Sequence, residues 1–210
     1  RLWEKIKKKA LQGRRTGLGI TAEGDMLAAL NLRYGTQDAI NFSEEIHKTI
    51  AVEAYRSSVE MAKERGAFQV FDPLREKDHP FVNRIKEQDA DLAENMEQWG
   101  RRNISLLTIA PTGTTSLMTQ TTSGIEPVFM PVYRRRRKVN PNDPNVRVDF
   151  VDESGDMWEE YVVFHPKFAT YLKSKGLDPE EAKQMEKKEL DKLIENSPYH
   201  KSTSNDVDWL

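Results

Sequence analysis

The segment from Arg101 to Ser116 constrains the fold of this chain most strongly. An apolar run from Ile104 to Ile109, suited to a buried strand, stops at Pro111, which cannot donate to a sheet ladder. Gly113 allows backbone angles that other residues avoid, and the residues from Ser116 onward are suited to a helix. The sequence therefore predicts a strand, a tight turn and a helix in immediate succession.

The turn is a candidate anion site. The first backbone N–H groups of a helix lack internal partners and carry the positive end of the helix dipole, so phosphate is a natural ligand. The alternative is a Thr-rich helix start in which Thr112 or Thr114 caps the helix and binds nothing. The turn has no Walker A lysine and is not G-x-G-x-x-G, so its spacing leaves both interpretations open.

Six stretches of the sequence together resemble one protein family. They are 13–20 (GRRTGLGI), 62–68 (AKERGAF), 109–117 (IAPTGTTSL), 123–129 (SGIEPVF), 132–139 (VYRRRRKV) and 199–209 (YHKSTSNDVDW). In this order they resemble large subunits of ribonucleotide reductases, and the adenosylcobalamin-dependent class II form most closely. The resemblance spans nearly the whole chain.

The resemblance implies a function that this sequence cannot perform alone. Ribonucleotide reductases convert ribonucleotides to deoxyribonucleotides with one thiyl-radical cysteine and a redox-active cysteine pair, whereas this chain has no Cys. We therefore expect no catalytic residue here and an inactive isolated chain, which we interpret as an interior slice of a larger reductase. A piece of a split reductase that needs partner chains, and a non-catalytic nucleotide-binding module, are the alternatives.

The same resemblance implies the binding residues. The substrate-binding set is Ala110, Pro111, Thr112, Gly113, Thr114, Thr115 and Ser116. Thr112 to Thr115 are expected to hold the terminal phosphates by N–H and hydroxyl groups, on a diphosphate or a triphosphate. Ile125 and Glu126 are candidates for the active-site floor, although Glu126 is equally suited to be a buried carboxylate that fixes neighbouring backbone.

The implied fold is an α/β partial barrel of the ten-stranded reductase type, rich in helix, with a peripheral β-hairpin. Strand 104–110 is expected inside, with helices 43–65 and 116–121 against it. A hairpin at 146–164 is expected outside, with strands at 146–150 and 161–164 and a turn around Ser154-Gly155. The expected domains are 1–135 as partial barrel with the loop at 110–116, 136–166 as hairpin insertion, and 167–210 as truncated helical continuation.

Local patterns predict the helices. Ser43 resembles an N-cap, and Gly66 is suited to a left-handed C-cap. A stripe at three- and four-residue spacing predicts the buried face of this helix, through Ile46, Ile50, Ala54, Ser58 and Met61. Further helices are predicted at 3–12, 25–32, 80–96 and 179–195.

Composition and charge limit the partners. Only 37% of the residues are apolar and 31% are charged, which predicts exposed helices or surfaces that meet other parts of a parent protein. The net charge of −2 gives no electrostatic case for nucleic acid. No apolar run approaches the ~18 residues of a membrane span and no signal peptide is visible, so we expect a cytoplasmic protein without membrane contact.

Three other groups of residues have simple interpretations. The basic run from Arg134 to Lys138 is expected to be a solvated face paired with nearby acids, with a phosphate contact as the alternative; the candidate acids are Asp149, Asp152, Glu153 and Asp156. The four His residues lack ligand spacing, so no metal site is expected. Arg14 and Arg15 are expected to position a turn.

The resemblance also implies cofactors and partners. These are adenosylcobalamin, for which no residue here can be assigned, the ribonucleotide substrate, the remainder of the reductase, and a thioredoxin-type reductant acting through a cysteine-bearing tail. A homodimer is a further expectation. Class I reductase remains the alternative to class II.

Overall fold

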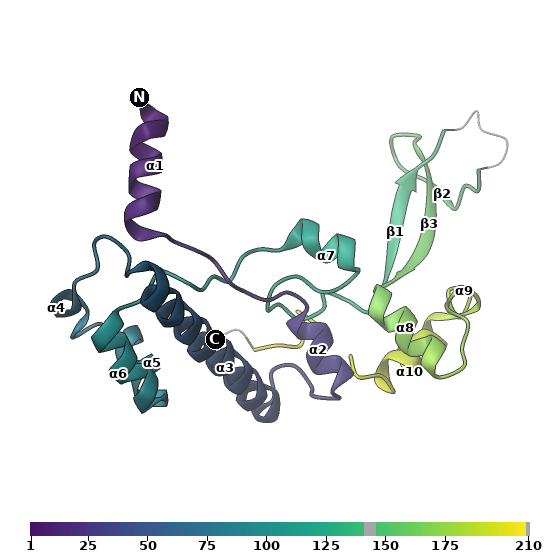
Figure 1. The fold of residues 1–210 in the computed structure, drawn as a ribbon. Coiled ribbons are helices and arrows are strands. Elements are labelled where there is room, and N and C mark those ends of the chain that lie inside the picture. The colour runs from purple at the N-terminus through teal and green to yellow at the C-terminus, as the bar shows by residue number, and fades with distance from the viewer. Residues whose placement is uncertain (141–145, 209–210) are drawn as a thin grey trace. The chain divides into compact units, whose positions relative to one another are not determined.

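The computed structural model describes residues 1–140 and 146–208 (Figure 1). Part of the predicted 136–166 insertion and the end of the 199–209 stretch lie outside the described residues. The chain forms two compact units. Unit 1 contains residues 1–20 and 40–110, and unit 2 contains 21–39 and the residues from 111 onward.

Unit 1 is helical. Its helices are α1 (Leu2–Gly13), most of α3 (Gln37–Arg65), α4 (Pro73–Glu76), α5 (Pro80–Gln88) and α6 (Ala90–Trp99). The predicted end of α3 is confirmed, because Gly66 follows Arg65 with φ +78°. The predicted start at Ser43 is wrong. The helix begins at Gln37 because the Thr36 hydroxyl accepts the Ala39 N–H at 3.4 Å, which supplies an earlier cap.

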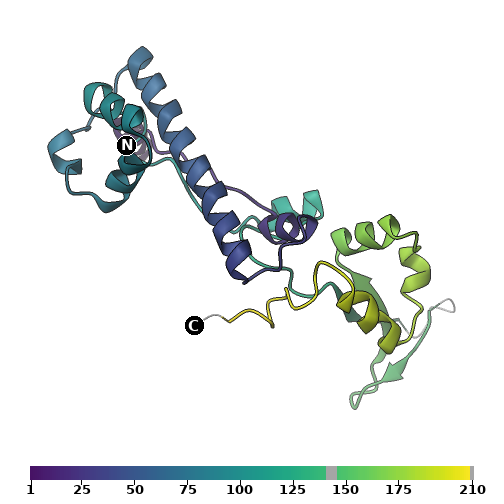
Figure 2. The same cartoon turned by 90° about the horizontal axis from the view of Figure 1, so that it is seen from below.

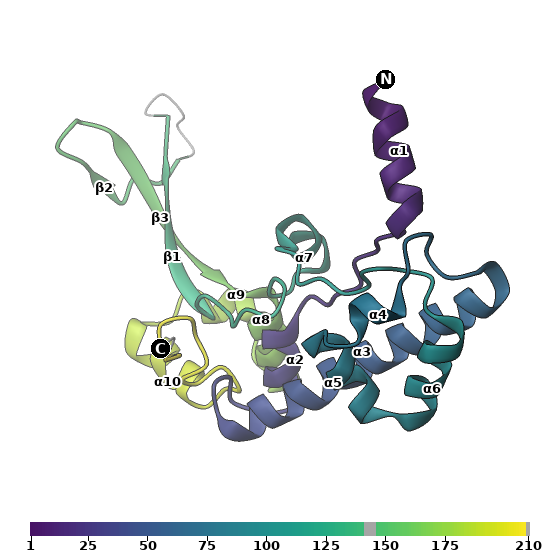
Figure 3. The same ribbon diagram turned by 90° about the vertical axis from the view of Figure 1, so that its left-hand side faces the viewer.

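The core of unit 1 lies where α3 packs against α5 and α6 (Figure 3). Its buried side chains are Ala51, Tyr55, Val59, Val82, Ile85, Leu92, Met96 and Leu106. Most of the predicted stripe on α3 is only half-buried, and the fully buried stripe runs one residue further along. The predicted helix 80–96 is divided at Asp89, whose carboxylate caps α6 through the Leu92 N–H at 2.7 Å and pairs with Arg56 of α3 at 2.5 Å.

The predicted strand 104–110 is an extended segment rather than a buried strand. It forms one parallel bridge, Leu18 to Leu107, beside backbone hydrogen bonds from Leu18 N to Leu106 O at 2.7 Å and from Thr108 N to Leu18 O at 2.9 Å. Among the described residues only this one neighbour pairs with it, so its outer side is open and Ile109 is 56% exposed. A Cβ on Gly19 would lie 2.2 Å from Thr108 O, so this close pairing requires glycine.

Unit 2 combines a small sheet with short helices. The helices are α2 (Glu23–Ala29), α7 (Gly113–Thr119), α8 (Pro166–Ser174), α9 (Pro179–Ala182) and α10 (Lys187–Glu195), and the strands are β1 (Val132–Lys138), β2 (Phe150–Val151) and β3 (Met157–Phe164). The strand order is β1-β3-β2, all antiparallel. The described residues thus contain a three-stranded sheet and extended segments, not a closed barrel, and the three-part domain division stays a prediction.

The predicted hairpin is present, with its turn at Ser154-Gly155. Gly155 has φ +80°, and Val151 pairs with Met157 across the turn. The predicted first strand was misplaced, because β2 contains only Phe150 and Val151. The basic run forms a third strand, β1, that pairs with β3 along its whole length.

The core of unit 2 gathers at the base of the sheet, where α8, α9 and α10 meet (Figure 2). Phe168 and Leu172 of α8 are fully buried. The Phe168 ring contacts the Phe164 ring edge-to-face, with 5.6 Å between the ring centroids. The predicted helix 179–195 is two helices. It is interrupted before Glu186, which begins α10 through a reciprocal capping box with Glu189.

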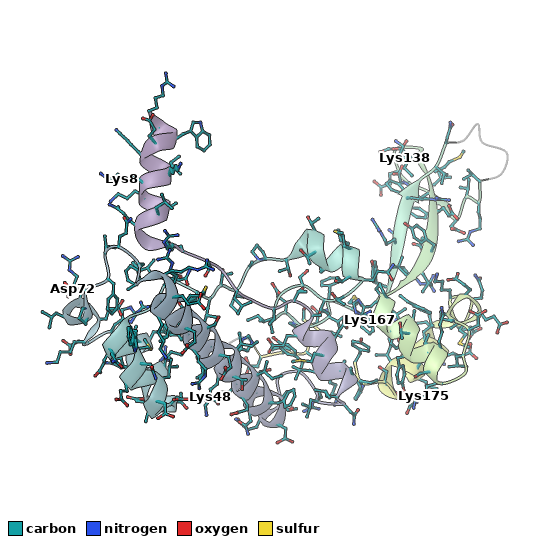
Figure 4. The ribbon with its side chains drawn as sticks, viewed as in Figure 1. Lys8, Lys48, Asp72, Lys138, Lys167 and Lys175 are labelled. Carbon is teal, nitrogen blue, oxygen red and sulfur yellow. The ribbon has the colours of Figure 1, made fainter. Side chains whose placement is uncertain are left out.

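The basic face of β1 is neutralised across the sheet. Glu160 pairs with Arg136 at 2.6 Å and with Arg134 at 3.7 Å, while Glu159 pairs with Arg137 at 2.6 Å. Lys138, labelled in Figure 4, pairs with Asp156 at 2.6 Å. The expectation of a solvated face paired with acids is confirmed, although within the described part of the chain only Asp156 of the four candidate acids forms an ion pair with the run.

Candidate functional site

The loop predicted at 110–116 overlaps the first turn of α7, because this helix begins at Gly113 and not, as predicted, at Ser116. Thr112 stands at the N-cap position, but its hydroxyl makes no capping bond to α7. Instead, its oxygen accepts the Gly124 N–H at 2.7 Å and shares a hydrogen bond with the Thr21 hydroxyl at 2.8 Å. The side chain therefore anchors the loop to the segments behind it, which contradicts the simple capping interpretation for this residue.

Ser116 is the second anchor of the loop. Its side chain is buried, and its hydroxyl donates to Gly113 O at 2.8 Å and shares a hydrogen bond with the Ser123 hydroxyl at 2.8 Å. The Ser116 N–H donates to Thr112 O at 2.8 Å and closes the first turn of α7. These contacts turn the Ser116 hydroxyl toward the protein.

The other predicted loop residues face outward. Pro111, Gly113, Thr114 and Thr115 are exposed, and Ala110 is half-buried. The Pro111 carbonyl accepts the Gly113 N–H. Among the hydrogen bonds of the described residues, none uses the N–H groups or hydroxyls of Thr114 and Thr115. The loop therefore presents its unused donors at Thr114 and Thr115, with Thr112 and Ser116 holding it from behind.

Ile125 and Glu126 follow the loop and are fixed through their backbone. The Tyr34 hydroxyl donates to Ile125 O at 2.7 Å, and the Glu126 N–H donates to Ser123 O at 3.1 Å. The Glu126 side chain is exposed, so its interpretation as a buried carboxylate is wrong. Burial raises the pKa of Tyr34, and the negative charges of Glu23 and Glu126 raise it further.

Gly24 brings α2 against this segment. A Cβ at this position would lie 2.6 Å from Glu126 O and 3.1 Å from Pro127 Cα. The Glu23 N–H donates to Gly124 O at 3.2 Å beside this approach. Only a residue without a side chain permits so close a contact between helix and loop.

A buried polar cluster that sequence reasoning missed lies next to these segments. Asp25, on the first turn of α2, is 7% exposed. One of its carboxylate oxygens contacts His165 Nε2 at 2.7 Å and accepts the Tyr199 hydroxyl at 2.8 Å, while the other accepts the Thr122 N–H at 2.9 Å. We call Asp25, Thr122, His165 and Tyr199 the Asp25 cluster.

The cluster controls the protonation of its members. Burial alone raises the pKa of the Asp25 carboxyl, but the hydrogen bond and charge of His165, with the bonds from Thr122 and Tyr199, outweigh burial and hold that pKa below its ordinary value. Burial and the neighbouring Asp25 charge raise the pKa of Tyr199 far above its usual range. Asp25 is therefore an ionised acceptor and Tyr199 a neutral donor.

The sequence offered one weak signal for this cluster. Asp25 precedes the apolar run Met26-Leu27-Ala28-Ala29, where an acid on the buried side of a helix needs partners. Those partners come from 97, 140 and 174 positions further along the chain, a pairing that local patterns do not encode.

The remaining candidates hold no ligand set. The described residues contain no group of three or more His, Asp or Glu able to hold a metal ion. Arg14 lies at the C-cap of α1 with φ +47° and its carbonyl accepts the Asn103 amide at 2.7 Å, which fits the expected role in positioning a turn. No helix within the described ranges is both long and apolar enough to cross a bilayer.

Comparison with known proteins gives one consistent family. Residues 2–207 match the model of the ribonucleotide reductase barrel domain. A vitamin B12-dependent ribonucleoside-diphosphate reductase of Mycobacterium tuberculosis is 33% identical over 122 residues, which are 58% of this chain and 15% of that protein. A ribonucleoside-diphosphate reductase subunit alpha of Chlamydia pneumoniae is 30% identical over 146 residues, covering 60% of this chain and 14% of that protein.

A solved structure shares the fold. The alpha subunit of the Actinobacillus ureae class Id ribonucleotide reductase superposes with a TM-score of 0.50 at 19% sequence identity, and the match covers 97% of this chain and 27% of that one. The chain therefore spans a minor part of the length of the proteins it resembles.

Proposed function

Because this chain belongs to the ribonucleotide reductase barrel-domain family, we propose that it supplies the substrate-phosphate loop of a ribonucleoside-diphosphate reductase. The curated relatives it matches are several times longer, so the proposed activity is that of a larger enzyme in which these residues work. We propose a diphosphate substrate, because those relatives are named ribonucleoside-diphosphate reductases.

One observation carries the proposal: Thr114 and Thr115 are exposed and their donors have no partner among the described residues, while the neighbouring Thr112 and Ser116 are anchored. Backbone N–H and hydroxyl groups of this kind bind phosphate oxygens through charge-assisted hydrogen bonds, which are stronger than bonds between neutral groups. Because both hydroxyl anchors face the protein, we assign Thr112 and Ser116 to shaping the loop and Thr114 and Thr115 to contacting phosphate. Ala110, Pro111 and Gly113 set the turn.

The proposed contribution to the reaction is positioning. Holding the phosphates of the nucleotide fixes the ribose relative to the reacting groups, and the donors offset the phosphate charge. The radical and reducing thiols belong to the rest of the enzyme, because this chain has no Cys. Reduction by a thioredoxin-type dithiol, a homodimeric assembly and a cytoplasmic location are parts of the same proposal.

We further propose class II chemistry for the whole enzyme, because relatives from Mycobacterium tuberculosis and Thermoplasma acidophilum are named vitamin B12-dependent. Adenosylcobalamin supplies the radical in that class. Two of the four histidines already have partners in this chain: His165 is bonded to Asp25, and His79 Nδ1 accepts the Val82 N–H.

The test replaces both outward-facing threonines of the loop. In the assembled reductase, Thr114→Val with Thr115→Val removes two hydroxyl donors and is expected to raise KM for the nucleoside diphosphate about 10-fold or more, since bonds to charged groups contribute about 1.5–3 kcal/mol each. Thr119→Val, at the other end of α7, is the matched control and should leave KM unchanged. An unchanged KM in the double variant contradicts the proposal.

A binding measurement separates phosphate recognition from other effects. The assembled reductase is titrated with a nucleoside diphosphate and with the corresponding nucleoside. The double variant is expected to lose affinity for the diphosphate only, because the nucleoside has no phosphate for the loop to hold. Equal losses for both ligands would show that the loop recognises another part of the nucleotide.

A further inference from the structure

The phosphate loop is a short structure with little internal support. Helix α7 has 7 residues, and no side chain caps its N-terminus. Isolated helices of this length are marginal in water, because nucleation is costly and few bonds follow it. The geometry of the Thr114 and Thr115 donors therefore depends on what holds Thr112 and Ser116 from outside the loop.

The hydroxyl protons define how Thr112 is held. The Thr21 hydroxyl donates to Thr122 O at 3.3 Å, which uses its single proton. In the hydrogen bond between the two threonine hydroxyls, Thr112 must then be the donor and Thr21 the acceptor. The Gly124 N–H occupies the other side of the Thr112 oxygen at 2.7 Å. The result is a directed chain of bonds from Thr112 through Thr21 to Thr122.

Thr122 in turn is held by Asp25. Its N–H donates to the Asp25 carboxylate at 2.9 Å, and its hydroxyl accepts the Asp25 N–H at 3.2 Å. Both residues are buried, so these two bonds are shielded from competing water. The bonds of His165 and Tyr199 fix the carboxylate from the opposite oxygen.

We propose that Asp25 is a positioning residue for substrate phosphate, acting on the loop through Thr122, Thr21 and Thr112. This rests on the proposed function of the loop and adds a residue that touches no part of it. An ionised carboxylate with three donors has one favoured orientation, and the two hydroxyl bonds transmit that orientation to the start of α7.

The alternative is that Asp25 only stabilises the fold. Loss of a purely structural contact lowers the fraction of folded enzyme and hence the apparent kcat, while the remaining folded molecules bind substrate normally. Loss of positioning instead weakens phosphate binding in folded molecules, which raises KM and the dissociation constant. The two roles thus differ in which constant changes.

The first experiment compares Asp25→Asn with Glu76→Gln in the assembled reductase. Asp25→Asn keeps the size of the side chain but removes the charge and one acceptor site, and we expect KM and the dissociation constant for nucleoside diphosphate to rise about 10-fold. Glu76→Gln weakens a buried ion pair in unit 1 and serves as the destabilised control. If Asp25→Asn lowers only kcat, as expected of the control, Asp25 has no positioning role.

A second pair of variants tests the connection without disturbing the buried charge. Thr21→Ser keeps the hydroxyl and should preserve KM, whereas Thr21→Val removes it at similar volume and should raise KM as Asp25→Asn does. Equal KM values for the Ser and Val variants would overturn the proposal, even if Asp25→Asn failed to fold. These two variants also leave the four residues of the Asp25 cluster unchanged.

Comparison with the loop variants shows whether the positioning role of Asp25 or the proposed function of the loop is wrong. If Thr114→Val with Thr115→Val raises KM but neither Asp25→Asn nor Thr21→Val does, the loop binds phosphate and the positioning role is wrong. If none of these variants changes KM, the proposed function itself is wrong.

Discussion

Arg101 and Glu76 form a two-pronged ion pair inside unit 1. Arg101 Nη2 lies 2.7 Å from Glu76 Oε1, and Nη1 bonds the other carboxylate oxygen. The Arg101 side chain is 4% exposed and lies over the rings of Tyr55 and Phe68, each at 5.5 Å. Two further donors, on Nε and Nη2, bond the carbonyls of Asn103 and Ile104.

This pair connects α4 to the segment that leads into the phosphate loop. Arg101→Ala leaves the Glu76 carboxylate without its partner and two backbone carbonyls without their donor. We expect a loss of about 3–5 kcal/mol in the free energy of unfolding, the usual consequence of breaking a buried pair on one side. Urea unfolding of unit 1, followed by tryptophan fluorescence, measures it.

The exposed arginines of β1 provide the comparison. Arg137→Ala removes an ion pair to Glu159 whose arginine side chain is 63% exposed. Solvent screens such a pair, so the expected loss is at most about 1 kcal/mol. Similar losses for Arg101→Ala and Arg137→Ala would show that burial of the Arg101 pair contributes nothing.

The depressed pKa of Asp25 predicts an acid-dependent loss of stability in unit 2. Because the folded-state pKa lies below the ordinary value of 3.8, the unfolded chain binds a proton more readily than the folded chain. The contribution of Asp25 is therefore fully present above the unfolded pKa and declines as pH falls through the folded pKa. Chemical unfolding at pH 7, 5, 4 and 3 should show it.

Asp25→Asn isolates this contribution from other acids. The difference in unfolding free energy between the parent chain and this variant should shrink as pH falls from 5 to 3. A difference that stays constant to pH 3 would show that the carboxylate does not lose its bonds on protonation.

The sequence predicted elements whose signals are local. Gly66 ends α3 because a left-handed residue is needed there, and Ser154-Gly155 turns the hairpin for a similar reason. The prediction from sequence was wrong where contacts with other residues determine the structure. Ser43 resembles a cap, yet Thr36 caps the helix earlier, and the apolar run 104–110 has too few partners among the described residues to become a buried strand.

The candidate site shows the same limit. Loop residues 110–116 could be proposed from sequence because the turn chemistry and the family resemblance coincide there. The different roles of the residues within the loop could not be predicted from sequence. They depend on Thr21, Ser123 and Gly124, which contact Thr112 and Ser116 only after folding. Asp25 gave only a weak signal for the same reason: its partners are distant in sequence.

The contact at Gly24 gives a last prediction. A methyl group at this position would meet Glu126 O at 2.6 Å, and because that atom belongs to the backbone it cannot turn away as a side chain can. Gly24→Ala must therefore push α2 and the 122–127 segment apart, at an expected cost of about 1–3 kcal/mol, although alanine favours helix. The displacement also lengthens the bonds between Asp25 and Thr122, so KM for nucleoside diphosphate should rise with it.

Gly66→Ala is the matched control. Gly66 also has a backbone conformation that favours glycine, but a Cβ at this position would meet nothing within 4 Å. Its positive φ makes alanine unfavourable there, so stability should fall while KM stays unchanged, since α3 ends far along the chain from the loop. Thermal unfolding and steady-state kinetics on both variants separate the two effects. A Gly24→Ala enzyme with normal stability and normal KM would show that α2 and the loop do not approach each other as closely as this structure has them.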